Sequence, residues 1–347
     1  MHPKLIMTAR IMTVNCFTDL NRGKEFPALQ LLFVKNIFFT SLGLNYVIMM
    51  SYLSLSPLSF TFLSGFEPEF QSLVSAWITL MIVVVLVCFI VSEITRNYSQ
   101  VDKLWSLVPL AYGWITVAAY PSPRLFLMAA LVTIWGLRLS YNFYRKGGYS
   151  IIPWKGEEDY RWQVLRETSA LNGRLRFGLF NLLFISLYQN LLILLFSTPL
   201  LMAALYHDTP LGATDLIAAA LMLIFIITET IADNQQYRFQ QAKRNMEAGQ
   251  REQGGSFQKG FLTDGLWKHV RHPNFASEQA IWISFYLFSV TASGQWINFT
   301  LIGPVLLVIL FIGSSVMTEK ISSSKYPDYS TYQKEVPKFI PRLFRRK

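Results

Sequence analysis

Residues 73–94 read LVSAWITLMIVVVLVCFIVSEI, and this stretch decides the class of fold. It contains no charged side chain before Glu93. A helix needs about 20 consecutive apolar residues to cross the hydrocarbon core of a bilayer. The apolar residues form a continuous run, without the alternation of a half-buried strand or the spacing of an amphipathic helix. We therefore predict a transmembrane helix here.

The composition of the 347-residue chain is that of a protein surrounded largely by lipid. Hydrophobic residues make up 52% and charged residues 15%, whereas soluble domains carry about 25% charged residues. Apolar runs of this kind give about eight predicted spans: Lys35–Leu55, Leu73–Ile94, Leu104–Ala119, Leu125–Phe143, Gly178–Tyr206, Ala213–Ala232, Phe275–Ser289 and Trp296–Thr318. The span from Gly178 is long and contains Pro199, so it is predicted to be tilted or kinked. We predict an all-α, polytopic membrane bundle of about seven to eight transmembrane helices.

Basic residues are distributed very unevenly between the predicted loops. With a cytoplasmic N-terminus, the cytoplasmic segments hold nearly all Lys and Arg, including residues 145–176, residues 238–271 and the tail from Lys320. Arg124 is the one basic residue predicted on the opposite side. Because Lys and Arg are enriched in cytoplasmic loops, both termini are predicted to be cytoplasmic. The net charge of +10 is thereby explained by topology, and no nucleic-acid partner is expected.

The chain is predicted to divide into two parts. Residues 1–100 form an N-terminal segment with two predicted spans, and residues 101–347 form a single integrated membrane bundle. The loop 145–176 is more than a linker, because Trp154, Tyr160 and Trp162 stand among its mixed charges. No metal site is expected, since the two cysteines lie far apart and the four histidines lack ligand spacing.

Ionisable and amide side chains inside membrane spans are costly and are therefore candidates for function. In the predicted topology they gather near the cytoplasmic ends of their helices: Glu93, Asp102, Arg138, Asn142, Glu229, Asp233, Glu278 and Glu319. This layout suits an anionic ligand from the cytoplasm and an apolar ligand from the lipid. The chain contains no GxxxxGK[ST] sequence and no GxGxxG after a strand, which excludes a P-loop or a Rossmann domain.

The densest polar signal is residues 265–278, GLWKHVRHPNFASE. Pro273 can begin a helix, and Asn274 and Glu278 would then lie one turn apart on one face. Arg271 and His272 would stand at the helix mouth, where backbone N–H groups favour an anion. The alternative interpretation is an ordinary basic segment that flanks and caps a membrane helix.

Several motifs in order resemble a known family. They are VDKLW (101–105), WGLRL (135–139), ETIAD (229–233) with Gln236 and Phe239, GLW (265–267), RHPNF (271–275) with Glu278, and the tail from YPDY (326–329) to PKFIP (337–341). Together they resemble the C-terminal domain of the steroid 5α-reductases, and most closely the membrane proteins of unknown function related to them. The chain departs from the usual pattern at Phe275, where Tyr is common, and at Ser277, where Gly is common.

The resemblance implies a membrane-embedded reductase that uses NADPH on the carbon–carbon double bond of an enone lipid, typically a 3-oxo-Δ4 steroid. The cofactor-binding residues carried over are Arg138, Glu229, Asp233, Arg238, Arg271, His272, Asn274, Glu278, Tyr326 and Tyr329. Asp102 and Tyr141 are the implied catalytic pair that polarises the substrate carbonyl. The expected membrane is the endoplasmic reticulum in a eukaryote or the inner membrane in a bacterium.

Other interpretations stay open at this point. Asp102 could cap a helix, Arg138 could extend to the membrane interface, and Tyr141 could belong to an interfacial aromatic belt. The isoprenylcysteine methyltransferases, which bind S-adenosylmethionine, resemble the same C-terminal region and share its Arg-His-Pro stretch. A sterol- or lipid-binding scaffold without catalytic activity is the third possibility.

Overall fold

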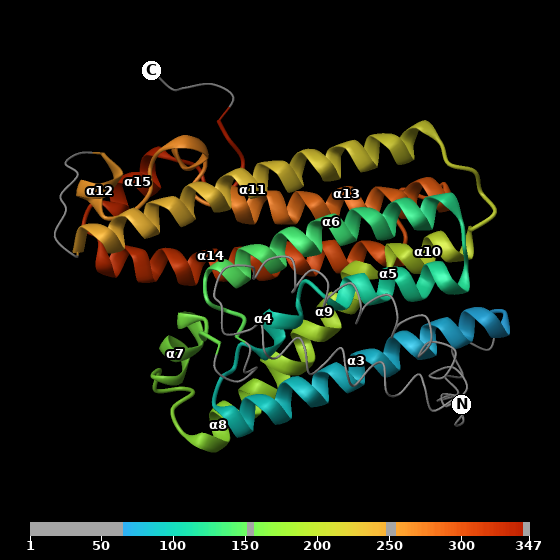
Figure 1. The fold of residues 1–347 in the computed structure, drawn as a ribbon, viewed down its shortest axis with the longest axis horizontal. Helices are drawn as coiled ribbons and strands as arrows, with labels where there is room; N and C mark the ends of the chain where they lie inside the picture. The colour runs from blue at the N-terminus through green and yellow to red at the C-terminus, as the bar shows by residue number, and fades with distance from the viewer. Residues whose placement is uncertain (1–64, 151–155, 248–254, 343–347) are drawn as a thin grey trace, which may run out of the picture. The chain divides into compact units, whose positions relative to one another are not determined.

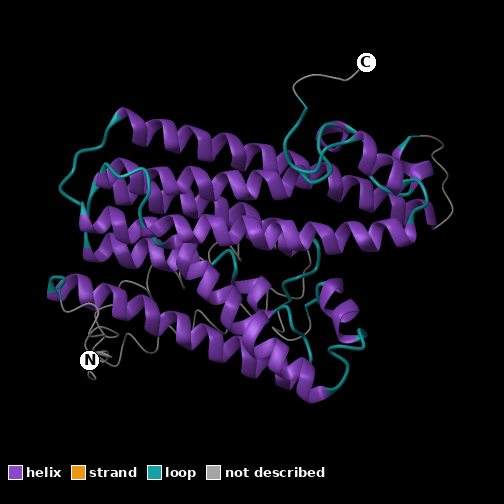
Figure 2. Cartoon of the chain, turned by 180° about the vertical axis from the view of Figure 1, so that it is seen from behind, coloured by secondary structure: helices purple, strands orange, loops and turns teal. Residues whose placement is uncertain are grey.

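The computed structural model describes residues 65–150, 156–247 and 255–342, and its regular structure within these ranges is entirely helical (Figures 1 and 2). The long helices are α3 (Pro68–Thr95), α5 (Val108–Ala119), α6 (Pro123–Arg145), α11 (Ala213–Glu247), α13 (Pro273–Ser293) and α14 (Ile302–Lys325). The short ones are α4 (Gln100–Leu104), α7 (Tyr160–Arg166), α8 (Arg174–Phe180), η3 (Asn181–Tyr188), α9 (Gln189–Ser197), α10 (Pro199–Leu205), α12 (Ser256–Lys259), η4 (Gly265–Lys268), η5 (Phe299–Leu301) and α15 (Tyr329–Glu335). The all-α prediction is confirmed for these residues.

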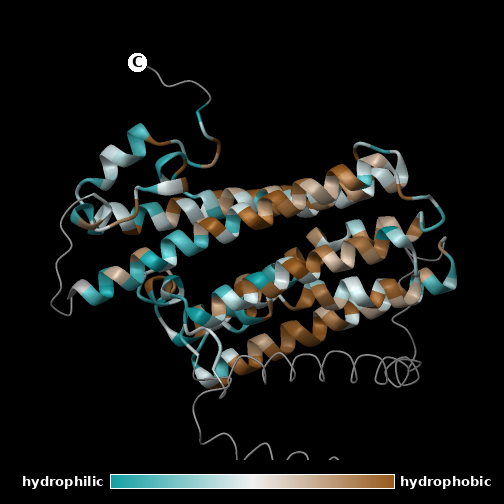
Figure 3. Cartoon of the chain, turned by 45° about the horizontal axis from the view of Figure 1, so that its top comes forward, coloured by the Kyte–Doolittle hydropathy of each residue, from teal (hydrophilic) through white to brown (hydrophobic). Residues whose placement is uncertain are grey.

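Five helices in the described ranges are long and apolar enough to cross a membrane, which indicates an integral membrane protein. They are Pro68–Thr95, Pro123–Arg145, Arg174–Leu205, Ala213–Asn245 and Phe299–Lys325, and each coincides with a predicted span. The predicted span Lys35–Leu55 lies outside the described residues. Figure 3 shows hydrophobic colour along the helices and hydrophilic colour where α11 ends beside α12 and α15.

Two predicted spans differ from the helices found. The predicted Leu104–Ala119 is divided, because the chain turns after α4 and Pro109 stands in the first turn of α5. That leaves α5 with 12 residues, too few for a straight span. The predicted Phe275–Ser289 is longer in the structure, where α13 has 21 residues. It begins at Pro273, as predicted, and ends before Gly294, whose φ of +70° suits glycine.

The helix α3 belongs to the same compact unit as the helices that follow it, residues 64–347. Within this unit α11 and α13 lie side by side, with α6 packed against both (Figure 1). The core between them is aromatic: Trp282 meets Trp135 edge-on at 4.9 Å between ring centroids and Phe196 at 4.0 Å. All three side chains are fully buried. The division of the chain near residue 100 stays a prediction.

Gly136, in the WGLRL motif, lets α5 and α6 approach closely. A Cβ at this position would lie 2.3 Å from Leu110 Cδ1 and 2.5 Å from the Ser106 carbonyl oxygen. Since neither distance is compatible with a side chain, only glycine allows this packing. The contact holds α4 and the start of α5 against the C-terminal half of α6.

The long apolar segment is divided into α9 and α10 just before Pro199, and it also contains a π-helix. Pro199 stands in the first turn of α10, after a break at Thr198. Upstream, η3 has the wider π geometry, which is rare and often found at functional sites. Its aromatic side chains stack: Phe180 on Phe184 at 5.1 Å, and Phe184 on Tyr188 at 5.3 Å.

Arg124, the basic residue that the predicted topology leaves on the non-cytoplasmic side, is held in a buried ion pair. Its Nε and Nη2 atoms donate to the two carboxylate oxygens of Asp215 at 2.8 and 3.0 Å. Both side chains are at most 2% exposed. The guanidinium also donates to the carbonyl oxygens of Thr209 and Pro210. This bidentate pair joins the start of α6 to the first turn of α11.

The variant Asp215→Asn should lower the free energy of unfolding by about 1–3 kcal/mol, because a buried guanidinium loses its charged partner but keeps some hydrogen bonds. Chemical denaturation in detergent measures the change. Asp208→Asn is the matched control, since Asp208 lies nearby and is 94% exposed. Equal stability of both variants and the parent protein would contradict the role assigned to this pair.

Candidate functional site

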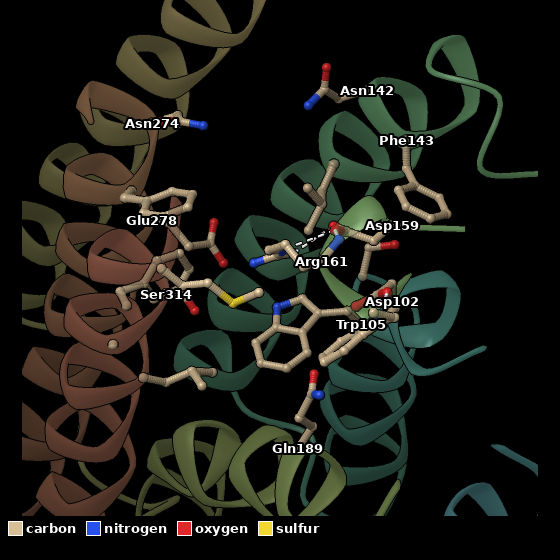
Figure 4. Close-up of a pocket in the computed structure, with 18 of the residues that line it drawn as sticks. Asp102, Trp105, Asn142, Phe143, Asp159, Arg161, Gln189, Asn274, Glu278 and Ser314 are labelled. Carbon is tan, nitrogen blue, oxygen red and sulfur yellow. Dashed lines mark hydrogen bonds and ion pairs between the residues drawn. The ribbon is translucent and has the colours of Figure 1, made fainter. Parts of the chain in front are cut away.

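A cavity of about 660 Å³ lies between α4, α6, α7, η3, α11, α13 and α14 (Figure 4). The charged side chains that line it are Asp102, Lys146, Asp159, Arg161, Glu229, Asp233 and Glu278. Its aromatic walls are formed by Trp105, Phe143, Trp162, Phe180, Phe184, Tyr188, Phe275 and Phe311. The volume falls within the range of about 300–1,000 Å³ typical of ligand pockets.

At one end of the cavity, three lining carboxyl groups surround a guanidinium that lies behind the lining. These four side chains are here called the Arg138 cluster: Arg138, Glu229, Asp233 and Glu278. Arg138 Nη2 lies 2.9 Å from Glu229 Oε2 and 3.7 Å from Glu278 Oε2, and Nη1 lies 2.9 Å from Asp233 Oδ2. Arg138 is 10% exposed and each acid 6%. The residues come from α6, α11 and α13, and the four-residue spacing of Glu229 and Asp233 puts both on one face of α11.

Glu278 accepts hydrogen bonds from two buried indoles. The indole of Trp135 donates to its Oε2 atom at 2.8 Å, and the indole of Trp282 donates to Oε1 at 3.1 Å. Both indoles are buried, so these donors are fixed in place. They offset part of the cost of burying the carboxyl group.

Asp233 receives hydrogen bonds from two amides. Asn142 Nδ2 donates to Oδ2 at 2.8 Å, and Asn274 Nδ2 donates to Oδ1 at 3.5 Å. The Oδ1 atom of Asn274 is buried and has no hydrogen-bond partner. Asn142 in turn accepts from Arg145, whose guanidinium lies 4.4 Å from the ring centroid of Tyr237. The amides therefore connect the acidic end of the cavity to the C-terminal end of α6.

The opposite wall carries a second charged group, made by α4 and α7 (Figure 4). Arg161 binds Asp159 through two hydrogen bonds of 2.9 and 2.7 Å, and Trp162 Nε1 donates to Asp102 Oδ2 at 2.9 Å. Burial, and then the negative charge of Asp159, raise the pKa of Asp102. Burial would also raise the pKa of Asp159, but the adjacent Arg161 holds it below its usual range. Asp102 is thus the lining acid outside the membrane helices whose pKa is raised.

Arg271 and His272 do not line the cavity. Arg271 Nε donates to Glu319 Oε1 at 2.7 Å, and its Nη1 donates to the carbonyl oxygens of Gln333 and Val336. His272 Nε2 lies 3.0 Å from the same Glu319 oxygen. The backbone N–H groups of Arg271 and His272 donate to the carbonyl oxygens of Pro337 and Lys338. These two side chains hold the C-terminal segment against α13 and α14.

Four more predicted site residues also lie outside the cavity lining. Tyr326 accepts a hydrogen bond from Lys243 at 2.9 Å, and Tyr329 packs in an aromatic cluster with Phe261. Tyr141 is 63% exposed on α6, and Arg238 is exposed on α11. The structure therefore brings together Asp102, Arg138, Glu229, Asp233, Asn274 and Glu278, either in the lining or directly behind it.

Sequence reasoning assigned a role to Asp102 of the second charged group, but none to its other members or to the aromatic walls. Asp159, Arg161 and Trp162 belong to the loop whose aromatic residues among mixed charges were the available signal. The stacking of Phe180, Phe184 and Tyr188 could not be predicted, because in the sequence they look like any other aromatic residues of an apolar span. Lys146, at the end of α6, is the remaining cation of the lining.

Comparison with known proteins identifies the family of the chain. The family model described as "Protein of unknown function (DUF1295)" matches residues 88–336. "Uncharacterized protein C594.04c" of Schizosaccharomyces pombe (strain 972 / ATCC 24843) is 38% identical over 266 residues, which are 73% of this chain and 75% of that protein. No solved structure matches the chain. The matched region spans every residue of the cavity lining. The chain therefore belongs to the DUF1295 family.

Proposed function

We propose that this protein is a membrane-embedded, NADPH-dependent reductase of a carbon–carbon double bond in an enone lipid or steroid. The observation that carries the proposal is the two-sided cavity, in which acidic and amide groups face an aromatic, apolar wall. Such a cavity accommodates a polar cofactor and an apolar substrate in contact with each other. The resemblance of the motifs to the steroid 5α-reductases supports the same reaction.

The donors and acceptors of the lining fit the parts of NADPH. Asn274 Oδ1, which has no partner, and the carboxylates of Glu229 and Asp233 can accept from a carboxamide N–H or a ribose hydroxyl. Lys146 and Arg161 are the cations that would face phosphate groups. Arg138, behind the lining, would orient the acids. When bound, NADPH supplies a hydride to the β-carbon of the enone.

Asp102 is the candidate acid for the substrate carbonyl. Its raised pKa favours a protonated carboxyl group, which donates a hydrogen bond to an oxygen on which negative charge develops. The indole of Trp162 fixes its orientation. Tyr141, the other predicted catalytic residue, is 63% exposed. Tyr188 lines the cavity. In this proposal the Tyr188 hydroxyl polarises the substrate carbonyl, which is the role that the sequence predicted for Tyr141.

The apolar part of the cavity is the proposed substrate side. Rings from α8, η3 and α13 face Leu310, Gly313 and Met317 of α14. A Cβ at Gly313 would meet no atom within 4 Å, so this position leaves room beside the aromatic wall. A small apolar lipid or a steroid suits such walls, and the surrounding bilayer is its source.

The proposal includes a topology. We propose seven to eight transmembrane helices with both termini in the cytoplasm, in the endoplasmic reticulum of a eukaryote or the inner membrane of a bacterium. In this orientation α6 and α11 end at the cytoplasmic side and α13 begins there, so the Arg138 cluster faces the compartment that contains NADPH. The basic cytoplasmic segments support the orientation.

A methyltransferase that uses S-adenosylmethionine is the second candidate, and one observation favours it. Three carboxyl groups against one guanidinium leave an excess of acid at one end of the cavity. That excess suits a sulfonium cation as well as it suits a nicotinamide ring.

Thermal unfolding of the purified protein in detergent with NADPH, NADH or S-adenosylmethionine distinguishes these functions. We expect NADPH to raise the unfolding temperature, since a ligand at a hundredfold excess over its Kd stabilises the folded state by about 2.7 kcal/mol. Asn274→Ala should raise the NADPH concentration needed for this response about tenfold, and Asn172→Ala, the matched control at an exposed amide, should leave the response unchanged. A response to S-adenosylmethionine alone would identify a methyltransferase, and no response to any would favour a non-catalytic scaffold.

A further inference from the structure

We propose that Gln189 determines the specificity of the cavity for its apolar ligand, through a hydrogen bond from its amide to a neutral oxygen of that ligand. The inference rests on the proposed function, because it takes the aromatic part of the cavity as the substrate side. It narrows the substrate class to a lipid that carries a hydroxyl or carbonyl group in addition to the carbonyl of its enone.

The position of Gln189 is the first observation. The residue stands where η3 meets α9, inside the apolar segment Arg174–Leu205, which is long enough to cross a membrane and carries no charged residue after Arg176. Its side chain is 5% exposed and lines the cavity. Figure 4 shows it pointing into the cavity from the end opposite Asn142 and Asn274. An amide buried at this depth is costly and is a candidate for function.

The second observation is that this amide has no partner. Gln189 makes no side-chain hydrogen bond to any residue that the structure describes. The other amides of the same segment are paired: Asn181 donates to Glu93 at 3.0 Å, and Asn190 donates to the carbonyl oxygen of Ser186 at 2.7 Å. A buried amide without a partner loses its hydrogen bonds to water and gains none in return. An oxygen of a bound ligand would supply what is missing.

The wall that leads to Gln189 is apolar. The stacked rings of Phe180, Phe184 and Tyr188 all line the cavity. The backbone hydrogen bonds of a π-helix join residues five apart, so Gln189 follows Phe184 by one turn of η3. A flat, apolar molecule that lies along the rings would therefore meet the amide at the end of this wall.

The charges of the lining indicate that the recognised oxygen is neutral. Among the described lining residues the cations are Lys146, at the end of α6, and Arg161, which already binds Asp159 through two hydrogen bonds. Neither belongs to the segment that carries Gln189. A carboxylate or phosphate beside Gln189 would be buried without a counter-charge, whereas a hydroxyl or carbonyl group needs only hydrogen bonds. The amide can donate to either group and can also accept from a hydroxyl.

Equilibrium titration of the full-length protein in detergent tests the inference with three probes of one framework. Androst-4-en-3-one has the enone carbonyl as its single oxygen, and its 17β-hydroxy and 11β-hydroxy derivatives add one hydroxyl at the end or at the side of the rings. Because the probes partition differently into detergent, the measurement is the Kd ratio of each hydroxylated probe to androst-4-en-3-one, compared between the parent protein and Gln189→Met.

Gln189→Met keeps the length of the side chain and removes the amide. It should weaken binding of at least one hydroxylated probe about tenfold, the net effect of one neutral hydrogen bond, and change binding of androst-4-en-3-one less than about threefold. Gln295→Met, at an exposed glutamine, is the matched control and should change no Kd. Thermal unfolding without a probe should show no loss of stability in Gln189→Met, since the amide that it removes has no partner in the protein.

The outcomes separate this inference from the proposed function. If Gln189→Met leaves both Kd ratios unchanged while the parent protein binds the enone, the inference is overturned and the proposed substrate class stands. A clear loss of stability in Gln189→Met would also overturn it, because the amide would then serve the fold. If none of the probes binds the folded parent protein, the proposed substrate class fails and the inference fails with it.

Discussion

Arg138→Met is expected to destabilise the folded protein by about 3–5 kcal/mol, because it removes one partner of a buried group of charges. Three carboxyl groups that now contact the guanidinium would face one another in a site at most 10% exposed. Only the indole and amide donors to Glu278 and Asp233 would remain. Thermal and chemical unfolding in detergent measure the loss.

Two further variants show that the effect is one of charge. Arg138→Met combined with Glu229→Gln should regain part of the stability, since it removes a repulsive partner along with the guanidinium. Arg238→Met changes the same type of residue at an exposed position of α11 and should be neutral. A parent-like stability of Arg138→Met would contradict the role of the guanidinium in stabilising these buried acids.

The sequence could predict that the Arg138 cluster assembles, because each of its residues can be recognised from the apolar span in which it lies. Every member is an ionisable residue near the predicted cytoplasmic end of an apolar span, and the alternating direction of the spans brings those ends to one depth. The structure brings the three acids within 2.9–3.7 Å of Arg138 atoms. The functional role of the residues stays a prediction.

The second charged group could not be anticipated in the same way. Asp159 and Arg161 lie in a segment that lacks the apolar run of a membrane helix. Their position beside the cavity depends on contacts with residues about α4, some 60 positions earlier, such as the hydrogen bond from the backbone N–H of Asp159 to Ser99 Oγ. The π geometry of η3 is likewise set by tertiary packing, since its sequence is simply apolar and aromatic. Helix propensity carries no information about either feature.

Arg271 and His272 show where a local pattern misleads. Their position before Pro273 predicts a helix mouth open to an anion, and the helix does begin at Pro273. The local pattern contains no information about residues more than 45 positions later in the chain. There Glu319 supplies the anion that binds both side chains, and the backbone carbonyl oxygens of Pro337 and Lys338 accept from the two backbone N–H groups. The mouth is thereby occupied by the protein itself.

Arg271→Ala is therefore expected to destabilise the protein by about 3–5 kcal/mol and to release the C-terminal segment. It removes the closest charged partner of Glu319, which keeps His272, the Gln333 amide and the more distant Lys338, and it removes the donors to the carbonyl oxygens that end α15. Hydrogen exchange of residues 326–340 should accelerate, whereas Lys338→Gln, which loses a contact of 3.7 Å, should have a small effect. Because neither residue lines the cavity, the variant protein that remains folded should bind NADPH with a Kd within threefold of the parent value. Loss of NADPH binding with unchanged exchange would instead return Arg271 to the cofactor site that the sequence motif first predicted for it.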